Sequence, residues 1–439
     1  MTGAGATDRR RQAWYLYGWA SHVFPTIVVT VFMSRYLTSV AENAVGKEGR
    51  VHVLGIPIAP GSLFVYTVTA STVVLVVLMP VVGAIADRTR RKRDIMLGCG
   101  WVGALACVAM VLVRGTNWQL GAILFVIAFI GYSCSIIVSY SLLVDLSTHD
   151  DRDRASSVGW ALSYIGGGLL LAADFVLSLA VDKSTLARIS LCTAGLWWIL
   201  FSLPVRGWLP EYIGTGTRGP RRGSLITEGF AQVAATVRQL PAYPLTLAFL
   251  GAFLVYNDGI QTVTTVAAQY GDKELQLSDT VLLLGILLVQ FVAYVGAIVL
   301  GRLAERVGAK RVVLGSLVVW LIAVGIGYRL SVGVAWQFFA LAILIALVLG
   351  GSQALSRAMF SRLIPAGSEA QYFGFYEISD AGTAWLGPLV FGLAYQNTGN
   401  YRSALVSLVV FFVVGFVLLY LVPVRRAIAA AGNPVPDKV

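Results

Sequence analysis

Long apolar runs dominate this chain and decide what it can fold into. The runs are continuous and about 20 residues or longer, which is the length that an α-helix needs to cross a bilayer. Hydrophobic residues make up 57% of the 439 residues and charged residues only 13%, which does not suit a soluble domain with a water-facing surface. Strands of a membrane β-barrel would instead alternate apolar and polar residues. We therefore expect an all-α membrane protein.

Polar breaks divide the runs into twelve predicted transmembrane helices, which we expect to form two pseudo-symmetric six-helix bundles. One long interior stretch lacks span-like hydrophobicity and separates the helices six and six. We expect an N-terminal bundle over 1–205, a cytoplasmic linker over 206–241 in which 225–240 forms a surface helix, and a C-terminal bundle over 242–439. The predicted helices are 13–37, 61–86, 94–114, 118–146, 155–181, 187–205, 243–268, 279–304, 311–330, 335–362, 370–396 and 402–423.

The distribution of Lys and Arg predicts the topology. Most of the 33 basic residues fall on the side that carries both termini, and the positive-inside rule makes that side cytoplasmic. The net charge of +11 is spread over many segments and forms no single patch, so we expect no nucleic-acid partner. We place the chain in the cell (cytoplasmic) membrane as a multi-pass protein with both termini in the cytoplasm.

Polar side chains at helical spacing mark the first and fourth predicted helices of each half. A spanning helix tolerates polar groups where they face other helices or water, so the equivalent helices of two halves would line a central cavity. Hydrogen bonding between helices is the alternative explanation. The stripes are His22, Thr26 and Thr30; Tyr132, Ser135 and Ser139; Asp258, Gln261, Thr262 and Thr265; and Ser352, Gln353, Ser356 and Arg357.

One histidine and four acidic residues fall well inside predicted spans, where a carboxylate costs about 2.5–3.5 kcal/mol. Asp258 and His22 are candidates for proton coupling or substrate binding, with a static buried pair as the alternative. Glu377 and Asp380 share a helix face near Arg357, so a structural ion pair and a substrate role are both open. The fifth is Asp174, in the outer half of its helix. The candidate substrate and coupling residues are His22, Asp258, Gln261, Thr262, Tyr132, Ser139, Gln353, Arg357, Glu377 and Asp380.

The chain contains no clustered catalytic set and nothing that resembles a nucleotide-binding loop. Its four cysteines lie within apolar spans without the close paired spacing of a zinc site, and we interpret them as packing residues. We therefore expect no enzyme activity, no metal and no cofactor.

A short basic loop occurs twice in the sequence, each time between two apolar segments. GAIADRTRRKR at 83–93 and GRLAERVGAKR at 301–311 share a Gly, an Ala, an acid followed by Arg, and a terminal Lys-Arg pair at identical spacing. Two similar halves around a central cavity are how many transporters are built. The doubled loop resembles the signature that the major facilitator superfamily carries between its second and third helices and repeats between its eighth and ninth.

This resemblance implies a conformational latch. In the superfamily the Gly permits close helix approach, the acid faces the N-terminus of a neighbouring helix, where the macrodipole favours it, and the Arg pairs with an acid at the end of the fourth helix. The implied latch holds the outward-facing state and consists of Gly83, Asp87, Arg88 and Asp145, with Gly301, Glu305 and Arg306 as its weaker copy.

Within the superfamily the chain resembles the vacuole effluxer-like, or autophagy-related permease, branch. The matching stretches are 17–20, 154–167, 256–262 and 356–388, although Gly18 stands where the branch usually has Asp. The resemblance implies the major facilitator fold and amino-acid-like substrates.

Together these features predict a monomeric secondary transporter in the lipid bilayer. We expect it to move a small solute by alternating access, coupled to protons. An exporter of amphipathic or drug-like compounds is an alternative, because Trp19, Tyr132, Tyr140 and Trp385 would line the path with aromatic surface. A non-transporting membrane receptor or scaffold is the alternative from another class.

Overall fold

The computed structural model describes residues 3–46, 48–53, 55–148, 150–213, 238, 240–365, 367–381, 386–398, 400–436 and 438. In its N-terminal half, which we take as residues 3–213, helices alternate with short turns. The elements are α1 (Gly3–Ser21), the π-helix η1 (Phe24–Met33), α2 (Ser34–Val45), β1 (Val51–Val53), β2 (Ile56–Ile58), α3 (Pro60–Thr89), α4 (Lys92–Ala109), the 3-10 turn η2 (Met110–Leu112), α5 (Trp118–Leu146), α6 (Arg152–Ser178) and α7 (Lys183–Trp208).

The C-terminal half, from residue 238 on, is helical throughout its described part. It contains the 3-10 turn η3 (Leu240–Ala242), α9 (Pro244–Lys273), α10 (Asp279–Val307), α11 (Ala309–Tyr328), α12 (Ala335–Arg362), α13 (Glu369–Ala381), α14 (Leu386–Thr398), α15 (Tyr401–Ser407), α16 (Val409–Leu421) and α17 (Val424–Ala430).

Local sequence explains several of the helix starts. α3 and α9 begin at proline, whose fixed φ suits the first helical position and whose missing N–H is not needed there. α7 is capped by Asp182, whose carboxylate accepts hydrogen bonds from the backbone N–H groups of Ser184 and Thr185, both at 3.0 Å.

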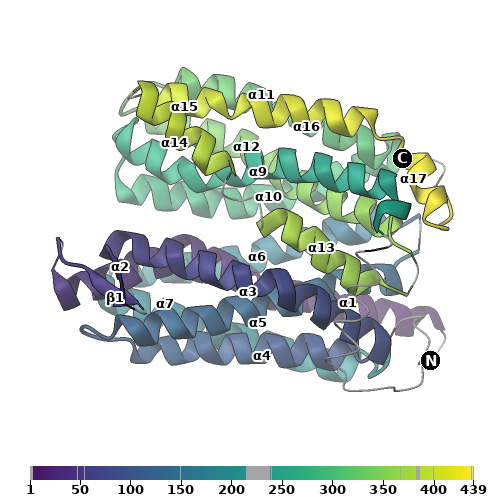
Figure 1. Ribbon diagram of the computed structural model, residues 1–439, viewed down its shortest axis with the longest axis horizontal. Helices are drawn as coiled ribbons and strands as arrows, with labels where there is room; N and C mark the ends of the chain where they lie inside the picture. Colours follow the sequence, from purple (N-terminus) through teal and green to yellow (C-terminus); the bar gives the residue numbers. More distant parts are fainter. Residues whose placement is uncertain are drawn as a thin grey trace.

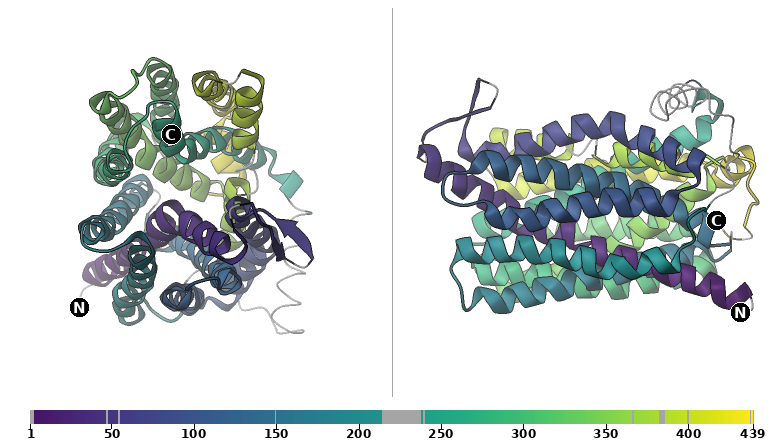
Figure 2. Two further views of the ribbon diagram at one scale, coloured as in Figure 1. Left: turned by 90° about the vertical axis from the view of Figure 1, so that its left-hand side faces the viewer. Right: turned by 90° about the horizontal axis from the view of Figure 1, so that it is seen from below.

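The two halves lie side by side with their helices running along the same direction (Figure 1). Both chain termini lie at one end of the molecule, which we call the terminal end, and the hairpin of β1 and β2 lies at the other. The end-on view in Figure 2 shows the N-terminal helices grouped together and the C-terminal helices grouped beside them. Between the halves, α6 packs against α10 and α12, and α3 packs against α13.

Ten helical segments of the described chain are long and apolar enough to cross a membrane. They correspond to ten of the twelve predicted spans. The predicted 243–268 span is the 30-residue helix α9, whose polar residues keep its hydropathy low. The predicted 370–396 span appears as α13 and α14, each 13 residues long, and the four residues between them lie outside the described chain. The count of twelve spans in two bundles of six stays a prediction.

The first predicted helix differs most from the structure. Instead of 13–37, the helical segment runs from Gly3 to Val45 and includes the π-wound stretch η1, in which the Thr30 hydroxyl donates to the carbonyl of Pro25 at 2.8 Å. The antiparallel hairpin that follows was not predicted, because its strands have only three residues each. The predicted surface helix at 225–240 falls almost entirely on residues outside the described chain.

Small residues bring helices into backbone contact, as is usual where lipid supplies no hydrophobic drive for association. Gly195 in α7 is an example: a Cβ added there would lie 2.4 Å from the carbonyl oxygen of Ala104 in α4. Gly98 in α4 provides a contrast, because a Cβ at that position would meet nothing within 4 Å. The α4–α7 packing therefore depends on the missing side chain at Gly195.

We expect Gly195→Ala to lower the thermal unfolding midpoint of the purified protein in detergent. Overpacking of this kind costs about 1–3 kcal/mol and outweighs the helix-propensity gain of Ala over Gly, which is about 0.5–1 kcal/mol. Gly98→Ala is the matched control, and its midpoint should stay the same or rise. An unchanged or raised midpoint for Gly195→Ala would contradict the close packing of α4 on α7.

Candidate functional site

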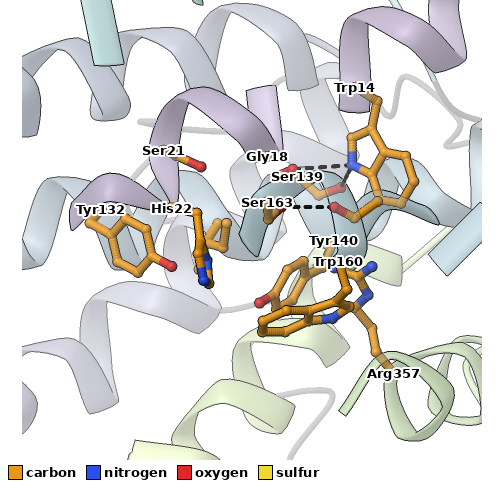
Figure 3. Close-up of a pocket in the computed structure, with 12 residues that line it drawn as sticks. Trp14, Gly18, Ser21, His22, Tyr132, Ser139, Tyr140, Trp160, Ser163 and Arg357 are labelled. Carbon is orange, nitrogen blue, oxygen red and sulfur yellow. Dashed lines mark hydrogen bonds between the residues drawn. The ribbon is translucent and has the colours of Figure 1, made fainter. Parts of the chain in front are cut away.

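A small cavity lies inside the molecule where helices of the N-terminal half meet α12 (Figure 3). Three helices of the N-terminal half form most of its wall, and α12 contributes one residue. The space within it is about 20 Å³, which holds about one water molecule. A larger solute therefore requires the surrounding helices to separate. The lining residues are Trp14, Gly18, Ser21, His22, Tyr132, Ile136, Ser139, Tyr140, Gly159, Trp160, Ser163 and Arg357.

Arg357 is the residue that the C-terminal half contributes to the cavity. Its guanidinium lies over three aromatic rings of the N-terminal half, 4.6 Å from the ring centre of Tyr140, 5.4 Å from Trp14 and 5.5 Å from Trp160. Cation–π contacts of this kind strengthen when they are desolvated, and the Arg357 residue is only 5% exposed. The same side chain joins the two halves and supplies a positive charge at the cavity wall.

Ser156 of α6 fixes the orientation of the Arg357 guanidinium. Arg357 donates from Nε to the Ser156 hydroxyl and from Nη2 to the Ser156 carbonyl, both at 3.0 Å. The Ser156 hydroxyl in turn donates to the carbonyl of Ala354 in α12 at 2.7 Å. These bonds make the start of α6 and the end of α12 a single hydrogen-bonded contact.

The structure brings three further predicted residues to the cavity, His22, Tyr132 and Ser139. His22 lies at the turn between α1 and η1 with its ring against Trp160 and Tyr164. Ser139 accepts two hydrogen bonds from the Trp14 indole, at its carbonyl and its hydroxyl.

Gly18 lies on the same helix face as His22. A Cβ at Gly18 would lie 2.6 Å from the Ser163 hydroxyl, so a larger side chain at this position would require Ser163 to move.

Other predicted residues lie away from the cavity. Asp258 in α9 is 2% exposed and accepts a hydrogen bond at Oδ2 from the N–H of Gly387, at the start of α14, at 2.7 Å. Thr262 donates to the carbonyl of Asp258, and Gln261 accepts at its carbonyl from Thr265. The structure thus does not bring Asp258 and His22 together as lining residues of one cavity.

Three predicted residues remain, Gln353, Glu377 and Asp380. Gln353 accepts a hydrogen bond from the Tyr164 hydroxyl at 3.4 Å. Glu377 in α13 lies near enough to Arg357 for an electrostatic interaction between the carboxylate and the guanidinium. Asp380 lies near the end of α13, and its side chain is outside the described part of the chain.

At the terminal end, the first copy of the basic loop makes a close contact with α13. Asp87 accepts hydrogen bonds from the N–H groups of Ala370 at 3.1 Å and Gln371 at 3.0 Å, in the first turn of that helix. A Cβ at Gly83 would lie 2.4 Å from the carbonyl of Ala370, so the missing side chain allows this approach. An acid at a helix N-terminus is favoured by the macrodipole and by the unpaired N–H groups.

The basic partner of Asp145 differs from the one that the resemblance implied. The implied partner was Arg88, whereas in the structure the ammonium of Lys92 lies 2.8 Å from the Asp145 carboxylate. The same ammonium lies 3.4 Å from Asp87 and 3.6 Å from Glu369 of the C-terminal half. Lys92 is the first residue of α4, one turn beyond the end of α3, and its side chain is 1% exposed.

The second copy of the loop is arranged differently. Gly301 packs against Ser157 in the first turns of α6, but Glu305 and Arg306 are exposed. The buried charge pair on this side consists instead of Arg362 at the end of α12 and Asp153 at the start of α6, 2.7 Å apart. The implied weaker latch is therefore replaced by an ion pair outside the repeated loop.

Several residues of the cavity and of the terminal-end contacts did not emerge from the sequence. A signal was present for Trp14, because Trp14, Gly18 and Ser21 follow one another on one face of a helix. Lys92 was treated only as one charge in a basic loop, although its alignment with Lys310 was visible. The residues missed include Trp14, Ser21, Ile136, Gly159, Trp160 and Ser163 at the cavity, and Lys92, Asp153, Arg362 and Glu369 at the terminal end.

Comparison with known sequences connects this arrangement to one family. A family model described as "Vacuole effluxer Atg22 like" matches residues 6–432. The MFS-type transporter YxiO of Bacillus subtilis, itself uncharacterized, is 28% identical over 427 residues, which cover 94% of this chain and 95% of the relative. Autophagy-related protein 22 of Eremothecium gossypii is 27% identical over 470 residues, which cover 96% of this chain and 92% of the relative.

Comparison with solved structures shows the fold. The proton:xylose symporter XylE matches with a TM-score of 0.71 at 11% identity, covering 96% of both chains. FucP in the outward conformation matches with a TM-score of 0.62 at 11% identity, covering 93% of this chain and 97% of its own. A bacterial homologue of ferroportin in an outward-facing state gives 0.65 at 14% identity, covering 94% and 98%. The chain therefore has the fold of the major facilitator superfamily.

We expect Lys92→Met to destabilise the protein strongly, whereas Lys310→Met, its counterpart in the second loop, should not. Removing Lys92 leaves three buried carboxylates without their ammonium, which costs about 3–5 kcal/mol. Among the described residues, Lys310 donates to the carbonyls of Tyr420 and Val422 and lies over the Tyr420 ring, and it faces no carboxylate, so its loss should cost less, about 1–2 kcal/mol. Thermal unfolding in detergent measures the difference, and equal midpoints for the two variants would contradict the central role of Lys92.

Proposed function

We propose that this chain moves an amino-acid-like solute by proton-coupled alternating access. The premise is that the chain belongs to the vacuole effluxer Atg22-like family of major facilitator transporters. The family makes the protein a multi-pass membrane transporter of a small solute and not an enzyme. The observation that carries the finer proposal is the cavity between the halves, with the Arg357 guanidinium from one half against aromatic rings of the other.

Alternating access fits the placement of the charged contacts. Lys92 with Glu369, and Arg362 with Asp153, join the two halves at the terminal end, which the charge distribution predicts to be cytoplasmic. The cavity holds about one water in this arrangement. We propose that these contacts form the latch of a state closed at the terminal end, and that their separation opens the cavity to that side.

The chemistry of the cavity supports a substrate with a carboxylate. Arg357 is the only permanent cation among the described lining residues, and a guanidinium recognises a carboxylate through paired N–H groups. The Arg357 guanidinium lies over the rings of Trp14, Tyr140 and Trp160 in this arrangement. When the helices separate and Arg357 turns to the substrate carboxylate, these ring faces would be open to the ammonium group of an amino acid. Hydroxyls of Ser139 and Ser163 add neutral hydrogen-bonding groups.

Two residues are proposed for proton coupling. His22 lines the cavity, where an imidazole can exchange a proton with the substrate path. Asp258 holds the start of α14 through the N–H of Gly387, and protonation of Asp258 would replace a charge-assisted bond by a weaker neutral one. We propose that protonation of Asp258 loosens α14 from α9 and in this way couples the proton to the movement of the C-terminal half.

The aromatic wall also favours a second candidate function, export of amphipathic or drug-like compounds. Tyr132, Tyr140 and Trp160 would bind such compounds without a carboxylate. A thermal-shift screen of the purified protein against amino acids, peptides and aromatic cations distinguishes the two, because ligands of the native state raise its apparent stability. Binders from the screen are then tested for flux in proteoliposomes with and without a pH gradient. Binding without any flux would favour a receptor and would overturn the transporter proposal.

For an amino-acid-like substrate, Arg357→Gln should weaken binding about tenfold or more. A hydrogen bond to a charged group contributes about 1.5–3 kcal/mol, and 1.4 kcal/mol corresponds to a factor of ten. Arg306→Gln removes an exposed charge from the second loop and serves as the control, with unchanged affinity. Titration by thermal shift or calorimetry measures the effect, and wild-type affinity in Arg357→Gln would exclude Arg357 as the carboxylate site.

Asp258→Asn should abolish accumulation driven by a pH gradient in proteoliposomes while exchange of labelled for unlabelled substrate continues. Asn keeps the size and the acceptor for Gly387 but cannot cycle a proton. Asp272→Asn, on the exposed part of the same helix, should accumulate substrate like the wild type. Retained gradient-driven accumulation in Asp258→Asn would exclude an essential protonation at this residue.

A further inference from the structure

We propose that the terminal end of this protein contains a second ligand site, which binds a phosphate-bearing anion. A cavity of about 480 Å³ lies there. It shares no lining residue with the small cavity around Arg357, which we call the aromatic cavity. Its wall combines the end of α5, the start of α6, the ends of α3 and α12 and the start of α13. Both halves of the molecule therefore contribute to it.

Three guanidinium groups line this cavity, those of Arg10, Arg90 and Arg152. Arg152 is 2% exposed, and its Nε has no hydrogen-bond partner within the described chain. Its Nη1 donates to the carbonyl of Ser361 at 3.2 Å. The Nε of Arg90 is likewise buried without a partner among the described residues. A buried, charged donor without an acceptor is costly, and a bound anion would supply the acceptor.

Backbone geometry holds Arg90 at this wall. Arg90 ends α3 in a left-handed conformation, with φ at 58°, which is uncommon for a residue other than glycine. Its carbonyl accepts a hydrogen bond from the N–H of Ile213 at 2.8 Å, which ties the segment after α7 to the same wall. The backbone N–H of Arg90 also donates to the carbonyl of Ala86 at 3.0 Å, so both backbone polar groups of this residue are hydrogen-bonded.

Nearby carboxylates compensate these arginines only in part, because three arginines and two carboxylates line the cavity. Asp145 and Glu369 also line the cavity, but both are within 3.6 Å of the Lys92 ammonium. Asp153, which follows Arg152, is paired with Arg362 at 2.7 Å. Asp151, which precedes Arg152, lies 2.6 Å from Arg11. The lining therefore keeps one more positive than negative charge, and the Nε groups of Arg90 and Arg152 have no acceptor among the described residues.

The chemistry of the wall selects the class of ligand. Guanidinium groups bind phosphate through several parallel N–H donors, and a phosphate offers more acceptor oxygens and more charge than a carboxylate. The volume admits a phosphate ester with a small polar group, and Asn433 and Tyr212 add polar side chains. A soluble phosphate ester and the headgroup of an anionic phospholipid share this chemistry, and both reach a cavity at the end of a membrane protein.

A bound anion would favour the arrangement in which the two halves are together. It would neutralise Arg90 and Arg152 of the N-terminal half, and Arg152 also donates from Nη1 to the carbonyl of Ser361 in the C-terminal half. A ligand seated among them stabilises the arrangement that is closed at the terminal end and slows its opening. This consequence for transport depends on the alternating-access proposal, whereas binding itself does not.

Thermal unfolding of the full-length protein in detergent tests the site, with pyrophosphate and inorganic phosphate as probes. The ionic strength is kept constant with chloride, because salt screening alone changes surface electrostatics. We expect a saturable rise of the unfolding midpoint in the wild type. Arg90→Gln and Arg152→Gln should each weaken the apparent affinity about tenfold. Arg426→Gln, which removes an exposed charge at the same end outside the cavity, should leave it unchanged.

A second arm distinguishes the source of the phosphate. The wild type and the variants are placed in nanodiscs of phosphatidylcholine with or without phosphatidylglycerol. Stabilisation by phosphatidylglycerol that is lost in Arg90→Gln, without an effect of pyrophosphate, identifies a lipid headgroup, and the reverse identifies a soluble ester. Should Arg152→Gln not fold, Arg152→Lys and Arg90→Gln provide the comparison. No stabilisation by either probe, or equal stabilisation of all variants, would overturn the proposal.

Discussion

Compensation of charge inside an apolar interior is the constraint on which the rest of this structure depends. Lys92 is 1% exposed and is surrounded by Asp87, Asp145 and Glu369. A buried ion is tolerable only beside opposite charge and hydrogen-bonding groups. Glu369 comes from the C-terminal half and the other two carboxylates from the N-terminal half, so the buried charge of Glu369 has this ammonium beside it only while the halves are together. The interaction that makes the buried charge possible therefore also closes the terminal end.

The doubled loop shows how one sequence pattern serves two different purposes. In the first copy, Gly83 packs against the start of α13, Asp87 accepts hydrogen bonds from its first N–H groups, and the Lys92 ammonium lies close to three carboxylates. In the second copy, Gly301 keeps the close helix contact, but Glu305 is exposed and the buried pair is Arg362 with Asp153. The two copies are thus similar in backbone packing and different in electrostatics.

The aromatic cavity is connected to the terminal-end contacts through α6 and α12. Ser156, which orients Arg357, lies one turn after Asp153, and Arg357 precedes Arg362 by little more than one turn. A helix transmits displacement along its length, so a shift of α12 relative to α6 changes the guanidinium at the cavity and the ion pair at the end together. Substrate at Arg357 and the closing contacts are therefore mechanically linked in the proposed mechanism.

The sequence by itself determined the membrane-helical class, the family resemblance and most helix positions, because apolar runs of this length have no other stable arrangement in lipid. Periodicity also placed His22, Tyr132, Ser139 and Arg357 among the cavity candidates.

Only the tertiary structure decided which polar residues share a space. It separated Asp258 from the cavity and assigned Lys92 to Asp145, because the rotation of a helix about its axis and the approach of distant elements depend on side-chain packing between helices. The hydrogen bond from Gly387 to Asp258 joins residues 129 positions apart, and spacing along the chain carries no information about such a contact.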